Sequence, residues 1–167
     1  GSLATLANLS SPHDVTVYGA GNFYIADMGN HRIRKVNGIT GVITTVSGVG
    51  NAEFSGDGGP ASNANLNSPQ GLTTDGSGKL YVADTANHRV REIDISTGVI
   101  TTVAGNGVAT HAGDGGPATL ASINSPKDVS VDASGNVFIA DSFNHRIRKV
   151  DGTGTITTVA GGGSSLG

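Results

Sequence analysis

Residues 79–93 read KLYVADTANHRVREI, and this stretch decides the fold because the chain repeats it. Residues 22–36 read NFYIADMGNHRIRKV and residues 136–150 read NVFIADSFNHRIRKV, so each copy begins 57 residues after the previous one. A regular period of this order is typical of repeat proteins, in which one supersecondary unit cannot bury its apolar faces alone and stacks on its neighbours. The sequence therefore predicts three copies of one unit.

Each copy contains four short runs rich in β-branched and aromatic residues, separated by Gly, Asp, Asn and Ser. In the middle copy we expect strands at 71–74, 80–83, 89–93 and 99–103, with a turn at 75–78. Four antiparallel strands joined by short turns form one blade of a β-propeller. The sequence thus predicts an all-β segment over residues 1–167, with four-stranded blades at about 10–47, 67–104 and 124–161 joined by long loops.

The pattern Gly-x-x-Tyr-Ile/Val-Ala-Asp-x-x-Asn-His-Arg-Ile/Val-Arg, followed by Ile-Thr-Thr-Val-Ala-Gly, resembles the NHL repeat. The resemblance covers essentially the whole chain and implies a β-propeller, most often six-bladed, of a kind found in binding modules and in a few enzymes. The long loops carry Gly-Asp-Gly-Gly-Pro-Ala at residues 56–61 and 113–118, which resembles a long-repeat variety of NHL proteins. Asp57 and Asp114 in these loops lack the several spaced oxygen ligands of a calcium loop, so we expect them to stabilise turns.

The repeated polar motif is expected to be architectural, because the same set recurs at the corner of every blade. Asp and Asn favour such turns, His can donate or accept there, and an Arg such as Arg89 can bridge to a carboxylate with two hydrogen bonds. A ligand-binding role for the histidines is the alternative. The motif comprises Asp27, Asn30, His31, Arg32, Asp84, Asn87, His88, Arg89, Asp141, Asn144, His145 and Arg146.

A row of three blades leaves an apolar face bare at each end, and large bare faces mark association surfaces. Three blades are half of a six-bladed ring, and two chains related by a two-fold axis would close it, since oligomers favour closed symmetry. We therefore expect a homodimer. The clean boundaries also fit a natural half-propeller, an excised fragment or an engineered chain.

In the propellers that this chain resembles, the first strand of each blade lines the central channel. The starts of these strands vary here where the framework repeats, so the resemblance implies a binding site at the mouth of that channel. These positions are His13, Asp14, Gln70, Lys127 and Asp128. Imidazole and carboxylate groups suit divalent metals, which makes His13, Asp14 and Asp128 candidate metal ligands. The alternative is a solvated polar rim. No cofactor is otherwise predicted.

These features favour a non-catalytic scaffold or binding module that assembles with itself and takes a protein or small-molecule ligand on its loop face. The alternative is a metal-dependent hydrolase or lyase with its site at the channel mouth. The chain has no cysteine and no Gly-x-Ser-x-Gly motif, which leaves enzymatic interpretations weak. A net charge of −3 disfavours nucleic acid, and the longest apolar runs are too short for a membrane span. No compartment follows from the sequence, although an extracellular parent protein is one option.

Overall fold

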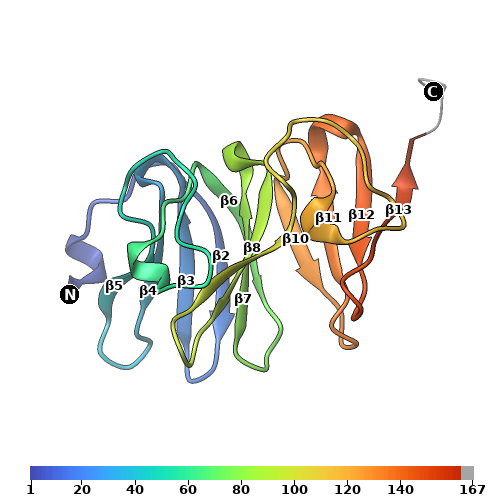
Figure 1. Ribbon diagram of the computed structural model, residues 1–167. Coiled ribbons are helices and arrows are strands. Elements are labelled where there is room, and N and C mark those ends of the chain that lie inside the picture. Colours follow the sequence, from blue (N-terminus) through green and yellow to red (C-terminus); the bar gives the residue numbers. More distant parts are fainter. Residues whose placement is uncertain (163–167) are drawn as a thin grey trace.

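The computed structural model describes residues 1–162, which form three antiparallel sheets placed side by side (Figure 1). The predicted strands of the middle copy are confirmed to within two residues at each end. The first sheet contains β2 (Pro12–Tyr18), β3 (Asn22–Asp27), β4 (Arg32–Val36) and β5 (Val42–Ser47). The second contains β6 (Pro69–Thr74), β7 (Lys79–Asp84), β8 (Arg89–Asp94) and β9 (Ile100–Ala104). The third contains β10 (Asp128–Val131), β11 (Val137–Asp141), β12 (Arg146–Val150) and β13 (Ile156–Gly161).

A short 3₁₀ helix and a left-handed histidine connect the second and third strands of every sheet. The helices are η2 (Met28–Asn30), η4 (Thr85–Asn87) and η6 (Ser142–Asn144). The histidine after each helix has a φ of 54°, 54° or 55°. His tolerates this conformation better than a β-branched residue would, so the Asn-His-Arg sequence turns the chain within four residues.

The long loops fold back onto the sheet that follows them, which the sequence did not predict. Pro60 bridges to Val99, and Pro117 bridges to Thr155. In the first sheet the corresponding segment is a regular strand, β1 (Ser2–Leu3), paired with β5. The first sheet therefore has five strands instead of four. A 3₁₀ turn follows each of these contacts, at η1 (Ala4–Leu6), η3 (Ala61–Asn63) and η5 (Ala118–Leu120).

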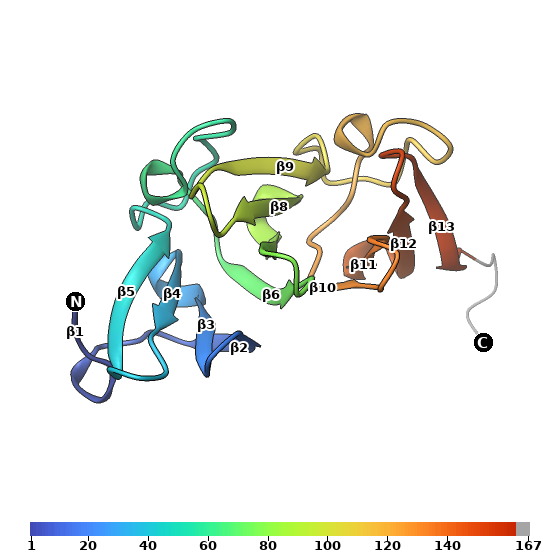
Figure 2. The ribbon, with the colours of Figure 1, turned by 90° about the horizontal axis from the view of Figure 1, so that it is seen from below.

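The hydrophobic core lies between the sheets. One cluster joins the first and second sheets and includes Tyr24, Ile33, Leu66 and Leu80. A second joins the second and third sheets. The sheets fan out in an arc, with β2, β6 and β10 on its concave side and β5 and β13 at opposite ends (Figure 2). The described chain is thus an open row of three blades.

Candidate functional site

The carboxylate at the end of each second strand is buried and organises the blade corner. Asp84 is fully buried and accepts hydrogen bonds from the Asn67 N–H at 2.7 Å and from Asn87 Nδ2 at 2.8 Å. Asp27 and Asp141 are equally buried and make the equivalent contacts. Burial raises the pKa of Asp84 to about 6, against the hydrogen bonds that favour its carboxylate.

The arginine that meets this carboxylate is Arg91, so the bridge expected from Arg89 was wrong. Arg91 is fully buried and donates to Asp84 Oδ2 at 3.3 Å and to Asp57 Oδ1 at 2.6 Å. Arg89 instead donates to the carbonyls of Asn87 and Asn106, and its guanidinium stacks 3.6 Å from the Phe54 ring centroid. The two arginines lie on one face of a strand, and distance from the corner decides which one reaches the acid.

The sequence suggested that the loop aspartates stabilise turns. They also form contacts with side chains of the sheet that follows. Asp57 accepts from Arg91 and from the Thr102 hydroxyl at 2.6 Å, and Asp114 accepts from Arg148 at 2.7 Å. Each carboxylate ties its loop to the following blade. His111 is exposed, and its Nε2 lies 3.7 Å from Asp114 Oδ2.

The repeated histidines accept hydrogen bonds between blades, a role the sequence analysis missed. His31 Nδ1 accepts from the Ser68 N–H and His88 Nδ1 from the Ser125 N–H, both at 3.0 Å. An accepting Nδ1 carries no proton. Burial, with a smaller contribution from the charge of Arg89, lowers the pKa of His88. The serine that lies 37 residues after His31, and again after His88, was the available signal.

Four of the five predicted mouth residues line one cavity of about 260 Å³ on the concave side. His13, Asp14, Lys127 and Asp128 surround it with Gly71, whereas Gln70 lies next to Gly71 outside this lining. The Asp14 carboxylate already accepts from two backbone groups, the N–H of its neighbour Val15 at 2.7 Å and the N–H of Leu72 at 2.8 Å. The cavity is therefore lined by acidic and basic side chains together.

The predicted metal ligands do not form a metal site within the described part of one chain. Across residues 1–162, no group of three or more His, Asp or Glu side chains lies close enough to hold an ion. A site built from both chains of a dimer stays a prediction.

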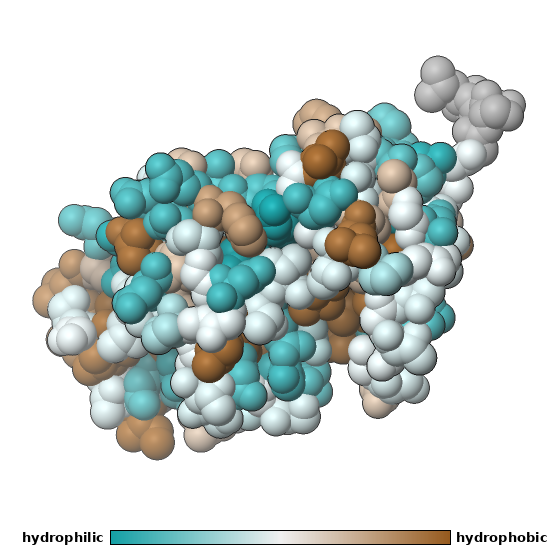
Figure 3. Space-filling model, viewed as in Figure 1, coloured by the Kyte–Doolittle hydropathy of each residue, from teal (hydrophilic) through white to brown (hydrophobic). Residues whose placement is uncertain are grey.

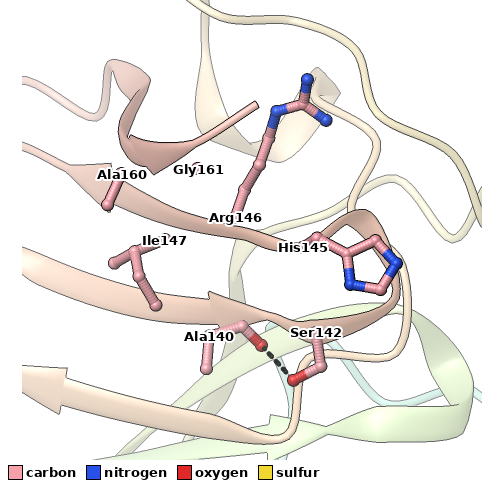
Figure 4. A pocket seen from close by; sticks show the side chains of 7 residues that line it. All are labelled: Ala140, Ser142, His145, Arg146, Ile147, Ala160 and Gly161. Atoms are coloured by element: carbon pink, nitrogen blue, oxygen red, sulfur yellow. Dashed lines mark hydrogen bonds between the residues drawn. The ribbon is translucent and has the colours of Figure 1, made fainter. Parts of the chain in front are cut away.

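Two further cavities lie on the end faces of the row. One, of about 310 Å³, is lined by Ala140, Ser142, His145, Arg146, Ile147, Ala160 and Gly161 on the third sheet (Figure 4). The other, of about 320 Å³, lies on the first sheet and is lined by Leu9, Pro12, His13, Asp14, Val15, Phe23 and Ile25. Figure 3 shows hydrophobic residues gathered at the N-terminal end of the molecule.

Comparison with known proteins confirms that the repeated motif is an NHL repeat. The model of the teneurin NHL domain matches residues 45–110 and 107–166, and the model of the NHL repeat matches residues 9–36. The chain belongs to the NHL-repeat family. NHL repeat-containing protein 2 of Gallus gallus is 38% identical over 120 residues, which are 71% of this chain and 16% of that protein. The chain thus spans less than a fifth of that relative.

Solved structures share the fold of this NHL-repeat chain. A Bacteroides thetaiotaomicron protein of unknown function superposes with a TM-score of 0.73 at 26% identity, over 86% of this chain and 36% of that one. Virginiamycin B lyase of Staphylococcus aureus superposes with a TM-score of 0.59 at 14% identity, over 89% of this chain and 41% of that one. No helix in the described part of the chain is long and apolar enough to cross a membrane.

Proposed function

We propose that this chain is a non-catalytic NHL-repeat scaffold and binding module, and that two copies close a six-bladed ring. One observation carries the proposal. Positions that are buried where two blades meet inside the chain are exposed at both ends of the row. The end faces are therefore two halves of a blade junction.

The face of the first sheet supports this assignment. Val15 is 58% exposed, whereas Leu72 and Val129 at the same position of the second and third sheets are 4% and 3% exposed. Both buried residues pack against the preceding blade, and residues 1–162 contain no blade before the first sheet. Since full burial of one such side chain is worth about 1.5–3 kcal/mol, a bare face of this kind favours association.

The face of the third sheet gives the matching half. Ile147 is 39% exposed, whereas Ile33 and Val90 at the same position are fully buried against the blade that follows. The chain also covers only 36% and 41% of the two solved structures above, so each of them is more than twice as long as the matched segment. A second copy supplies the missing half without any new type of contact.

In the closed ring, the concave mouth is where a ligand would bind. Each copy brings His13, Asp14, Lys127 and Asp128 to it. A protein or small molecule carrying groups of both charges fits such a rim. The lyase likeness stands at 14% identity and describes the fold alone, so an enzymatic activity is not proposed.

The test is the absolute mass in solution, measured by light scattering behind size exclusion across a dilution series. A mass twice that of the 16.6 kDa chain is expected. A monomer at all concentrations refutes the ring, and a larger closed assembly refutes the count of six blades.

A further inference from the structure

We propose that the cavity of Figure 4 is a receptor for Leu9 of a second copy, locked by a hydrogen bond from the Ser11 N–H of that copy to His145 Nδ1. The inference rests on the proposed pairing and adds to it the register of the junction and the residues that hold it. Figure 4 shows Ala140, Ile147 and Ala160 lining the cavity, with the His145 ring at its edge.

The internal junctions show what fills such a cavity. Leu66 and Ile123, which occupy the position of Leu9 in the next two repeats, are fully buried. The Cδ1 atom of Ile123 lies 3.1 Å from where a Cβ on Gly105 would stand, so this side chain fills the space beside that glycine. Gly161 occupies the same position in the third sheet and lines the open cavity. Leu9 is 37% exposed and is the remaining side chain of this set.

The hydrogen bond is prepared on both sides. Ser68 and Ser125, which donate to histidines of the preceding blade, have φ values of 50° and 48°, and Ser11 has 46°. His145 has the left-handed backbone of the other two histidines. Within residues 1–162, neither the Ser11 N–H nor the His145 Nδ1 has a partner. One end of the row thus carries a positioned donor and the other a positioned acceptor.

A second polar contact follows the same register. At the junction of the second and third sheets, the Thr85 hydroxyl donates to the Pro126 carbonyl at 2.8 Å. Ser142, in η6, holds the position of Thr85, and within residues 1–162 its hydroxyl donates only to the Ala140 carbonyl of β11. Pro12 of a second copy would present the matching carbonyl. Met28, at this position in the first sheet, has no hydroxyl, so the open junction resembles the second internal junction more than the first.

The two end faces of the row differ from each other, so each one can pair only with the opposite face of a second copy. A face that carries Leu9 and the Ser11 donor complements the cavity and the His145 acceptor, but neither face complements itself. Such a heterologous contact closes a ring only when the rotation per unit is right. Here the rotation repeats that of the chain's own junctions, so a second copy joins head to tail at two identical interfaces.

Cross-linking tests the register, because the chain has no cysteine. The Thr74 hydroxyl lies 3.4 Å from the Val17 carbonyl at the first internal junction. Val17 holds the position of Thr74, and Val131 holds that of Val17, so these two residues would be neighbours across the new junction. Ser130 precedes Val131, and its exposed side chain lies on the opposite face of β10 from that of the half-buried Val131. The side chains of Val17 and Ser130 would therefore face each other across the junction. Both are exposed. A mixture of Val17→Cys and Ser130→Cys chains should be joined by a short bis-maleimide, and neither variant alone should be joined to itself. Joining of Val17→Cys chains to each other would mean that like faces pair and would overturn the inference.

Leu9 has a matched control in Leu6. Leu6 is 75% exposed, and its counterpart Leu120 is 72% exposed although the third sheet has a preceding blade, so this position lies outside the junction. Leu9→Gln should raise the dimer dissociation constant by about 100-fold or more, since both interfaces of the ring lose one buried leucine. Leu6→Gln should leave it unchanged. A dimer that tolerates Leu9→Gln overturns the inference but leaves the proposed ring standing, whereas a wild-type chain that stays monomeric removes both.

Discussion

Replacing Arg91 by Met tests whether the repeated polar motif is framework or ligand site. The variant removes the donor that joins Asp84, Asp57 and the Ser55 carbonyl, while its length and apolar character keep most of the packing. Breaking a fully buried ion pair by removing one partner costs about 3–5 kcal/mol, because the other charge is left unpaired. The Asp57 contact adds little, since that side chain is 38% exposed and solvent screens it. We therefore expect the free energy of unfolding to fall by about 3–5 kcal/mol.

Arg34→Met is the matched control, because Arg34 holds the same place in the first sheet without the loop. It reaches only Asp27 Oδ2, at 3.5 Å, and keeps some exposure to solvent. A single long contact of this kind is worth about 1–2 kcal/mol. The assay is urea unfolding followed by circular dichroism, at one protomer concentration so that assembly contributes equally. Equal losses for the two variants would refute the argument that the fully buried pair of Arg91 and Asp84 contributes more stability than the longer, partly exposed contact of Arg34. Adding Asp84→Asn to Arg91→Met should restore part of the stability, because the unpaired buried charge is then gone.

The remaining predictions concern a histidine and a glycine at the blade junctions. The pKa of His88 is lowered in the folded state, so the stability that His88 contributes is complete above about pH 6.5 and is lost as the pH falls further. The pKa of Asp84 is raised, so the effect of Asp84 on stability has the opposite dependence on pH. The difference in melting temperature between the wild type and His88→Asn should therefore shrink from pH 7.5 to pH 5, since Asn tolerates the left-handed backbone and accepts at any pH; a constant difference would count against the hydrogen bond. Gly71→Ala should lower the free energy of unfolding by about 1–3 kcal/mol, because a Cβ there would lie 2.6 Å from the Asp128 Cα, whereas Gly152→Ala, with open space around it, should be neutral in the same urea assay.

The blades were predictable from the sequence because their signals are local. Four apolar runs separated by turn residues give strand positions directly, and a repeated spacing gives the number of blades. The hydrogen-bond partner of each polar side chain was harder to predict from the sequence. Arg89 and Arg91 lie on the same face of β8, and their distances from the corner decide that Arg91 meets Asp84. The path of the loop carrying Asp57, 34 residues away, then gives Arg91 a second partner. That path depends on the packing of Ala61 and Ala64 into the core between sheets, which no local pattern specifies.

The contacts between blades were missed for a related reason. The bond from Ser125 to His88 joins residues 37 apart, and each residue has an ordinary local explanation, the serine in a loop and the histidine at a corner. The proximity of the first-strand residues was easier to predict, because position along the first strand follows from the repeat. Four of the five residues line one cavity, and Gln70 lies next to Gly71 outside this lining. Their role in binding stays a prediction.

The comparison of the three repeats indicates which residues could bind a ligand. In the second repeat, hydrogen bonds within the protein engage the buried Asp and the Asn, His and Arg side chains of the motif. These side chains therefore stabilise the framework. The position at the mouth is different in every repeat, with His13, Gln70 and Lys127 in turn. Head-to-tail closure would place this series twice around one mouth. A ligand with two-fold symmetry, or two ligands at opposite sides, would match such a rim better than one asymmetric molecule, so the number of ligands bound per ring reports directly on how the ring is closed.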